Sequence, residues 1–268
     1  IYETVFGQLL AKCRGVAPGH KFRFKNKLLS LDASIIDLCA SLFDWAQFQR
    51  AKGAVKLHLV LDHDGYLPSF CVVTGGKTPD LAPARKMSFA PGTIVVFDRG
   101  YTDYQWFADL DGRGVFFVTR LKKGADYEVL ERGALPSRAG AVRRDEVIFF
   151  PSLAGGGSQA VLRRIECFDA EQERTLVFLT NHLKFAAATI AAIYKERWQV
   201  ELFFKALKQN LRVKTFVGTS ANALKIQIWT ALIAMLLLRH LKLRARWGWS
   251  LSNLVALLRQ QLFVHREL

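Results

Sequence analysis

The chain has 268 residues, enough to bury a large core, and its hydrophobic content of 51% excludes an intrinsically disordered protein. Its formal net charge is +15, and most of the excess lies in the last third, where 14 Lys and Arg residues from position 181 onward face three acidic ones. The first 180 residues hold 24 basic and 20 acidic residues. A basic surface of this size favours nucleic acid as the partner, with solubility or attraction to a membrane surface as the alternatives.

The cysteines and the apolar runs narrow the class of protein further. The four cysteines are scattered without a Cys-x-x-Cys pair, which disfavours a structural zinc site and is typical of a reducing compartment. The longest apolar run, residues 228–238, is too short to cross a bilayer and predicts a buried helix. Residues 1–21 are poorly patterned, and the sequence does not begin with Met, so we interpret this segment as the remnant of a missing N-terminal region.

Five strand-like segments come early in the chain and alternate with short helical ones. In the first, Leu29 and Leu31 share one face while Ser30 and Asp32 share the other. The fourth is an apolar run that ends in Asp98, which is typical of a central strand buried on both faces. This order predicts an α/β fold in which a mixed sheet is flanked by helices. Strands are expected at residues 27–35, 55–61, 67–74, 92–98 and 115–121, and helices at 81–87 and 102–110, the latter capped by Thr102.

The pattern changes at about residue 126, where strand-like segments separated by Gly-rich or polar turns replace the earlier rhythm. These segments predict a β-rich insertion over residues 126–180, and helical periodicity follows it. We therefore expect residues 22–125 and 181–268 to form one core that the insertion interrupts. The strands of the insertion are expected at residues 127–130, 143–150, 160–167 and 175–180, and the later helices at 185–211, 222–243 and 251–264.

A charged stripe runs along the helix expected at residues 185–211. At about 100° per residue, one arc of that helix collects a phenol, a carboxylate and three cations. A solvated charged face is the ordinary interpretation of such a stripe. This one borders the expected core face, which Val200, Phe203, Phe204, Leu207 and Leu211 would form. Its cations suit a phosphate backbone and its carboxylate suits a metal ion. The stripe consists of Tyr194, Arg197, Glu201, Lys205 and Lys208.

Four residues of this stripe form a longer signature. Tyr194, Arg197, Glu201 and Lys208 match the pattern Tyr-x2-Arg-x3-Glu-x6-Lys. On this signature the chain resembles the bacterial insertion-sequence DDE transposases of the IS-four type, the superfamily that includes the transposase of transposon five. The resemblance covers roughly residues 22–243.

The resemblance implies a ribonuclease-H-like catalytic core, with one aspartate on the first strand, one at the end of the fourth, and a glutamate on a late helix. Asp32, Asp98 and Glu201 occupy these positions. It also implies two Mg²⁺ ions, with Mn²⁺ as the alternative metal. Asp32 would bridge the two ions, and Asp98 and Glu201 would each complete one site. Carboxylate oxygens are the hard ligands that Mg²⁺ prefers.

The same resemblance implies how the protein meets DNA. Tyr194, Arg197 and Lys208 are expected to hold phosphates near the cleaved end, and Lys205 and Arg120 are additional candidates. The implied partners are double-stranded DNA at the element ends and at the target, and a second copy of the chain in a synaptic complex, with no membrane. The expected location is the bacterial cytoplasm, in association with the nucleoid.

Other acidic residues compete for the place of the first catalytic aspartate. Asp62, His63 and Asp64 are candidates for a small metal cluster, but a polar hairpin turn is preferred because Asp and the following Gly are turn formers. Asp37 and Asp44 are expected on the surface. An aspartate within an apolar strand, as at position 32, is costly to bury unless a cation or hydrogen bonds compensate it.

Two alternatives to an active transposase stay open on the sequence. One is a catalytically inactive or truncated transposase-derived protein that binds DNA without cutting it. The other is a stand-alone ribonuclease-H-like nuclease, which would need no paired DNA ends and would perform no strand transfer.

Overall fold

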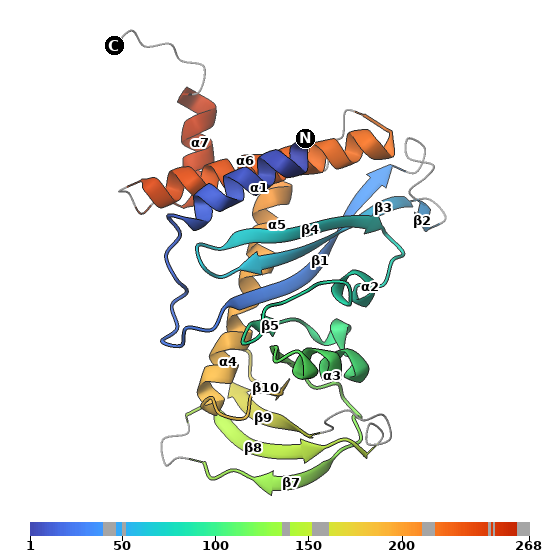
Figure 1. Cartoon of the computed structure of the whole chain (residues 1–268), viewed down its shortest axis with the longest axis vertical. Helices are drawn as coiled ribbons and strands as arrows, with labels where there is room; N and C mark the ends of the chain where they lie inside the picture. The colour runs from blue at the N-terminus through green and yellow to red at the C-terminus, as the bar shows by residue number, and fades with distance from the viewer. Residues whose placement is uncertain are drawn as a thin grey trace. The chain divides into compact units, whose positions relative to one another are not determined.

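The long strand β1 (Leu28–Cys39) takes part in both of the units into which contacts divide the chain. Unit 1 comprises Ile1–Phe22, Ala33–Thr78 and Gln199–Leu268, and unit 2 comprises Arg23–Asp32 and Pro79–Trp198. Each unit can be followed by its element labels in Figure 1. The structure is a computed structural model, and it describes residues 1–39, 47–49, 52–135, 140–151, 161–210, 218–245, 248 and 250–261.

The parallel part of the sheet lies in unit 2. The start of β1 pairs in parallel with β5 (Ile94–Val96), and β5 pairs in parallel with β6 (Phe116–Arg120). All three residues of β5 are buried, as expected for a strand that is covered on both faces. Tight packing continues at the aromatic side chains that follow, because Phe97 lies 4.8 Å from Trp106 between ring centroids. The strands expected around residues 92–98 and 115–121 are therefore confirmed.

An antiparallel series continues the sheet of unit 2. The strand β10 (Arg174–Thr180) pairs with β6 and with β9 (Val161–Asp169), and β8 (Val142–Phe149) pairs with β9 and with β7 (Glu128–Arg132). These are the four strands expected for the β-rich insertion. The boundaries 126 and 180 of that insertion stay a prediction. Asn181 joins the end of β10 to the rest of the unit, because its side-chain oxygen accepts from the Phe117 N–H at 2.8 Å.

Short helices connect the strands of unit 2. These are α2 (Leu81–Ala84), the 3-10 helix η2 (Arg99–Tyr101) and α3 (Tyr104–Gly112). The expectation that Thr102 caps the third of these was wrong. Asp103 is the cap, because its carboxylate accepts a hydrogen bond from the Trp106 N–H at 2.8 Å. The Thr102 hydroxyl instead donates to the Arg99 carbonyl at 2.8 Å.

The prediction of a single helix over residues 185–211 was also wrong. The structure has two helices, α4 (Ala187–Glu196) and α5 (Trp198–Asn210). Arg197 lies between them and is the C-cap of α4. The Arg197 N–H bonds to the Tyr194 carbonyl three residues back, at 3.1 Å, instead of continuing the four-residue ladder. Helical periodicity does not register such a break, because one tightened turn changes the phase of the pattern only slightly.

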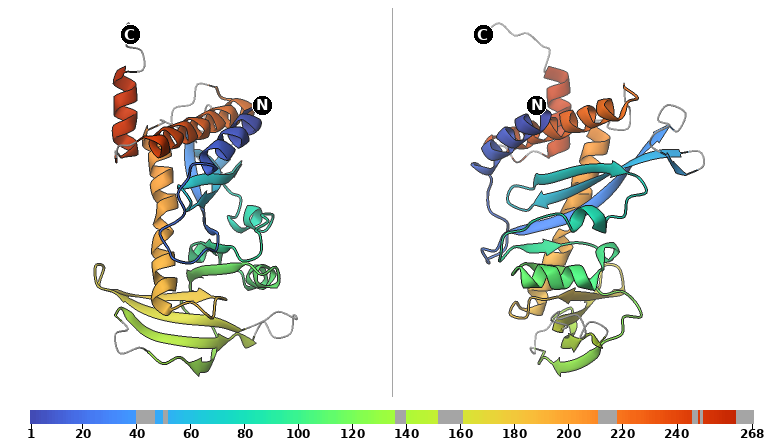
Figure 2. Two further views of the ribbon diagram at one scale, coloured as in Figure 1. Left: turned by 60° about the vertical axis from the view of Figure 1, so that its left-hand side comes forward. Right: turned by 45° about the vertical axis from the view of Figure 1, so that its right-hand side comes forward.

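Unit 1 combines an antiparallel hairpin with helices. The hairpin is β3 (Lys52–Asp62) with β4 (Leu67–Gly75), and β3 also pairs with β2 (Gln47–Gln49) and, in the strand order, with β1. The first helix, α1 (Tyr2–Arg14), was not expected from the sequence; it packs beside α6 (Ala221–Arg244) in both views of Figure 2. The last described helix is α7 (Leu251–Gln261), and residues 262–264 of its expected range lie outside the described residues.

One apolar cluster fills unit 1. It joins the hairpin to α1, α5 and α6 through side chains such as Leu10, Leu59, Phe203 and Leu232. By length and mean hydropathy alone, α6 would be able to cross a membrane. Leu232, Met235 and Leu236 of this helix belong to the cluster, while Leu237 and Leu241 are exposed. One face of α6 therefore packs in the core of unit 1, where the sequence predicted a buried helix.

Candidate active site

Asp32 lies within β1 and is largely buried, with 19% of its side chain exposed. A carboxylate in this position is unfavourable unless a positive charge compensates it. Arg197 supplies that charge, since its Nη1 lies 3.7 Å from the Asp32 Oδ2. The strand placement of Asp32 and the cationic compensation expected for it are both present.

Asp98 lies two residues after the end of β5 and is the N-cap of η2. Its Oδ1 accepts a hydrogen bond from the Gly100 N–H at 2.7 Å, which fixes the carboxylate beside the backbone. A Cβ on Gly100 would lie only 2.8 Å from that same oxygen, so the arrangement requires glycine. Because β1 and β5 are paired parallel strands, Asp32 and Asp98 both belong to the same edge of the sheet in unit 2.

The buried hydroxyl of Tyr101 is influenced by the charges of both Asp32 and Asp98. The pKa of Tyr101 is raised, first by burial and then by the negative charges of Asp32, Asp80 and Asp98, while Arg197 acts in the opposite direction. The Tyr101 hydroxyl is buried and has no hydrogen-bond partner among the described residues. Together these facts show that Asp32 and Asp98 act on one polar, water-poor location in unit 2.

The cationic side of this location involves three further groups. Arg197 lies over the Tyr194 ring, with 5.6 Å between Cζ and the ring centroid. Burial raises the pKa of Tyr194, whereas the charges of Arg197 and Arg120 lower it and that of Asp98 raises it. Arg120 ends β6. The structure therefore brings Tyr194, Arg197 and Arg120 to the aspartates, within unit 2.

Glu201, Lys205 and Lys208 lie on α5 in unit 1. The expected core face of this helix is confirmed for Val200 and Phe203, which are buried beside the half-buried Glu201. Leu211, expected on the same face, lies outside the described residues. Lys205 is exposed, and the Lys208 Nζ donates to the Ile35 carbonyl of β1 at 2.7 Å. The proposed joint action of Glu201 with the two aspartates stays a prediction.

Sequence analysis gave no role to three residues that this location uses. Gly100 holds Asp98, Tyr101 carries the buried hydroxyl, and Asp80, at the start of α2, adds a third negative charge felt by Tyr101. The sequence contained a signal for Gly100, because a glycine two residues after an aspartate favours a side-chain-to-backbone turn. Nothing in the sequence linked Asp80 to the site.

The competing acidic residues belong elsewhere. Asp62 ends β3, and its Oδ1 accepts from the Asp64 N–H at 3.0 Å, in a turn completed by Gly65 at φ +70°. The expected hairpin turn is therefore confirmed. Asp37 is exposed, and Asp44 lies outside the described residues.

The donors in unit 2 fit a divalent cation in their chemistry, because Asp32 and Asp98 offer hard carboxylate oxygens. Only one oxygen of Asp98 accepts a hydrogen bond from the described residues. Among all the residues that the structure describes, no three His, Cys, Asp or Glu side chains lie closely enough together to hold a metal ion by themselves. Two carboxylates plus waters and substrate phosphate is an ordinary set for Mg²⁺.

The sheet and the paired aspartates define a class of protein. The fold is a mixed α/β sheet flanked by helices, and its order of antiparallel β3 and β4 followed by parallel β1, β5 and β6 is ribonuclease-H-like, as expected. One aspartate lies on β1, and the other follows the adjacent β5. The chain belongs to the family described as Transposase DDE domain, whose model matches residues 23–237.

Similar proteins carry related names. A Sinorhizobium fredii protein named as the transposase y4zB is 32% identical over 212 residues, which is 78% of this chain and 59% of that protein. A Geobacillus stearothermophilus protein named as a transposase for insertion sequence element IS5377 is 28% identical over 243 residues, which is 90% of this chain and 63% of that protein. The chain thus spans about three fifths of the length of these relatives.

Among solved structures, the piggyBac transposase synaptic complex with hairpin DNA is similar, with a TM-score of 0.49 and 12% identity. The match covers 88% of this chain and 54% of that chain.

Proposed function

We propose that the protein is a DNA transposase that cleaves DNA at the ends of an insertion sequence and joins them to target DNA. The observation that carries the proposal is the placement of Asp32 and Asp98 on adjacent parallel strands, beside Arg197. Membership of the DDE transposase family supports it. Glu201 on α5 would complete the catalytic triad.

The reaction is a phosphoryl transfer in two steps. In the first, a water oxygen bonds to a phosphorus at the element end while the P–O3′ bond breaks, which releases a 3′-hydroxyl. In the second, that hydroxyl bonds to a phosphorus of the target and displaces its 3′ oxygen. Two divalent ions held by Asp32, Asp98 and Glu201, Mg²⁺ or Mn²⁺, would supply the positive charge that such displacements need.

The chain's own cations would position the substrate. Arg197 presents a guanidinium to the carboxylate edge and is well suited to a phosphate, because its planar donors match phosphate oxygens. Tyr194 lies against Arg197, and Arg120 adds positive charge to the same location. Lys205 and Lys208 on α5 would hold further phosphates. Paired ends would be held by two copies of the chain.

Cleavage of DNA that carries the element's own ends tests the triad. The full-length protein should nick this DNA only with Mg²⁺ or Mn²⁺, and Glu201→Gln should abolish nicking while DNA binding persists. Glu171→Gln is the matched control, since Glu171 is exposed and its removal should leave nicking unchanged. Normal cleavage by a folded Glu201→Gln protein would refute the proposal. DNA binding without cleavage in every metal would favour the non-catalytic alternative.

The salt dependence of DNA binding tests the phosphate contacts. Arg197→Ala and Lys208→Ala should each weaken binding and reduce the slope of log K against log salt by about one, since each removes one phosphate contact. Lys195→Ala should leave the slope nearly unchanged, because that side chain is exposed and sits beside Glu171. Unchanged slopes in the first two variants would contradict their assignment.

A further inference from the structure

Unit 1 contains a cavity of about 600 Å³ that the proposed catalysis does not use. Its walls come from the end of α6, from the segment after α1 and from the turn between β3 and β4. A volume of this size exceeds that of a bare phosphate and lies in the range of small-molecule sites. The cavity is lined by Val16, Pro18, Gly19, His20, Lys21, His63, Gly65, Tyr66, Arg239, Lys242 and Leu243.

The polar lining of this cavity is cationic. Arg239 and Lys242 lie three residues apart and therefore on the same side of α6. The Arg239 Nε is buried and has no hydrogen-bond partner among the described residues. Burial and then the Arg239 charge lower the pKa of Lys242, and burial lowers the pKa of Arg239. Arg239 thus disfavours the charge on Lys242, and a bound anion would stabilise the charged form of both side chains.

The carboxylates closest in sequence to this cavity are engaged with backbone groups. Asp64 Oδ1 accepts from the His20 N–H at 2.8 Å, and Asp62 Oδ1 accepts from the Asp64 N–H at 3.0 Å. No acidic residue belongs to the described lining. The charged side chains of the described lining, Lys21, Arg239 and Lys242, are therefore all cationic.

The apolar wall has an unusual backbone. Tyr66 adopts φ +54°, a left-handed conformation that residues with a Cβ rarely adopt. Gly65 beside it is at φ +70°, and a Cβ there would lie 2.8 Å from the Ala17 Cβ. This tight turn presents Tyr66 to the cavity, next to His63 at 5.7 Å between ring centroids. Aromatic faces of this kind suit a planar base or a sugar.

We propose that this cavity binds a nucleotide unit, with its phosphate on Arg239 and Lys242 and its sugar or base against Tyr66. The shared chemistry is a phosphate next to a flat apolar group, and its source is a free nucleotide or one nucleotide of a DNA strand. The cavity belongs to unit 1, whereas Asp32 and Asp98 belong to unit 2. Arg239 and Lys242 also lie beyond residues 23–237, which the family model matches.

Calorimetric titration of the full chain with thymidine 5′-monophosphate tests the proposal, without any cleavage step. Binding with a dissociation constant below about 1 mM is expected, with thymidine and inorganic phosphate each binding at least about tenfold more weakly. Lys242→Gln and Arg239→Gln should each weaken nucleotide binding by about tenfold or more, the order expected when one charge-assisted hydrogen bond is lost. Lys242→Gln remains informative if the half-buried Arg239 proves necessary for folding.

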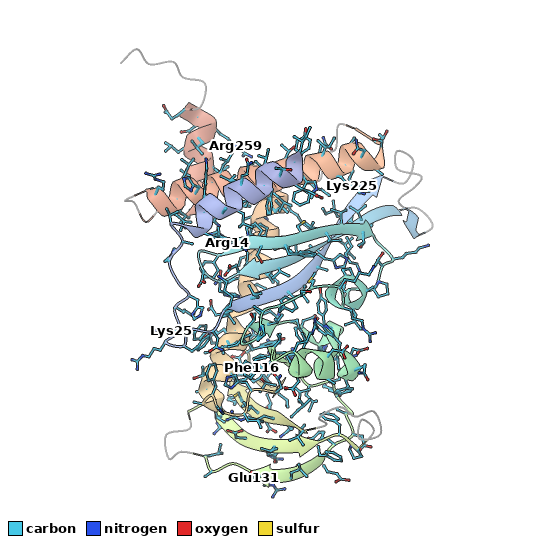
Figure 3. The ribbon with its side chains drawn as sticks, viewed as in Figure 1. Arg14, Lys25, Phe116, Glu131, Lys225 and Arg259 are labelled. Carbon is cyan, nitrogen blue, oxygen red and sulfur yellow. The ribbon has the colours of Figure 1, made fainter. Side chains whose placement is uncertain are left out.

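Lys225→Gln is the matched control. It removes one charge from the exposed N-terminal part of the same helix, as labelled in Figure 3, about 20 Å along the axis from Arg239. The affinity of the Lys225→Gln variant for the nucleotide should equal that of the unsubstituted chain. If the two cavity variants also weaken duplex DNA binding, the source is a DNA strand; if only mononucleotide binding falls, the source is a free nucleotide. Failure of the mononucleotide to bind, or equal affinity in all three variants, would overturn the proposal.

Discussion

In unit 1, the hairpin β3–β4 and the helices α1, α5 and α6 bury Leu59, Phe203 and Leu232 in one apolar cluster, whereas unit 2 buries ion pairs within its sheet. Of the twelve buried polar or charged side chains that the described residues contain, nine lie in unit 2. The other three, His58, Asp62 and His63, lie on β3 or in the turn after it. Apolar contacts are non-directional, while ion pairs and hydrogen bonds fix the positions of particular atoms.

Arg163 is an example of a buried charged side chain in unit 2 that connects several segments. Its guanidinium bonds to both Asp145 oxygens, at 2.7 and 2.6 Å, and also donates to the carbonyls of His182, Leu183 and Phe185. One side chain thereby connects two strands to the segment that leads into α4. Tyr194 and Arg197, the proposed substrate-binding groups, lie at the end of the helix α4 into which this segment leads.

The largest expected effect separates catalysis from stability within unit 2. Asp98→Asn should lower DNA cleavage by at least about a thousandfold, because several kcal/mol of charge stabilisation would be lost. The melting temperature should stay nearly unchanged, because an amide oxygen can still accept from the Gly100 N–H. Asp109→Asn, an exposed change on α3, is the control and should cleave normally. A large fall in melting temperature for Asp98→Asn would assign the carboxylate a structural role instead.

A second substitution tests the polar interior itself. Arg163→Met should lower the free energy of unfolding by about 3–5 kcal/mol, because it leaves Asp145 buried without its partner. Arg144→Met on the neighbouring β8 should change it by less than about 0.5 kcal/mol, because Arg144 is mostly exposed. Urea unfolding followed by circular dichroism measures both. Equal losses in the two variants would contradict the contrast between the units.

A smaller effect is expected at Gly100, where the backbone approaches the carboxylate of Asp98, which we propose is catalytic. Gly100→Ala places a Cβ 2.8 Å from the Asp98 Oδ1 and must displace it, so cleavage should fall by about ten- to a hundredfold. The displacement is local, and melting should change little. Gly112→Ala is the control, since its Cβ would meet nothing within 4 Å. Full activity in Gly100→Ala would show that Asp98 does not need this position.

The smallest effect concerns pH. Burial lowers the pKa of His182 from the usual 6.5, a backbone hydrogen bond raises it, and the charges of Arg163 and Lys184 lower it; the net direction is down. The His182 Nδ1 accepts from the Phe185 N–H at 3.2 Å, which requires a neutral ring. Below about pH 6.5 the unfolded imidazole binds a proton that the folded one excludes, so stability should fall as the pH falls through this value. The melting temperature of His182→Gln should fall less between pH 7.5 and 5. Identical pH dependence would remove His182 from this account.

Sequence patterns predicted the elements of the fold whose side chains are buried in a regular pattern. Alternation and apolar runs placed the strands that carry Asp32 and Asp98, and helical periodicity placed the core face of α5. The break at Arg197 was missed because one tightened turn leaves the helical periodicity almost unchanged. The helix α1 was missed because its buried side chains, such as Leu10, are sparse and find their partners on α6, far along the chain.

The residues of the candidate site also fall into two groups, those indicated by local sequence features and those that only the folded structure reveals. The resemblance to the DDE transposases assigned Asp98 by its place at a strand end and Glu201 by a spaced signature, and both of these are local features of the sequence. Tyr101 and Asp80 act through charge and burial across space, and these properties follow only from the assembled sheet.

The central claim is that the carboxylates of Asp32, Asp98 and Glu201 meet around divalent ions. Iron-directed hydroxyl-radical cleavage tests it most directly: Fe²⁺ is bound in place of Mg²⁺ to the full-length protein with end DNA, and the sites of backbone scission are mapped. The account predicts cuts around residues 32, 98 and 201, all suppressed by excess Mg²⁺. Cuts near the two aspartates with none near residue 201, or cuts that Mg²⁺ does not suppress, would contradict it.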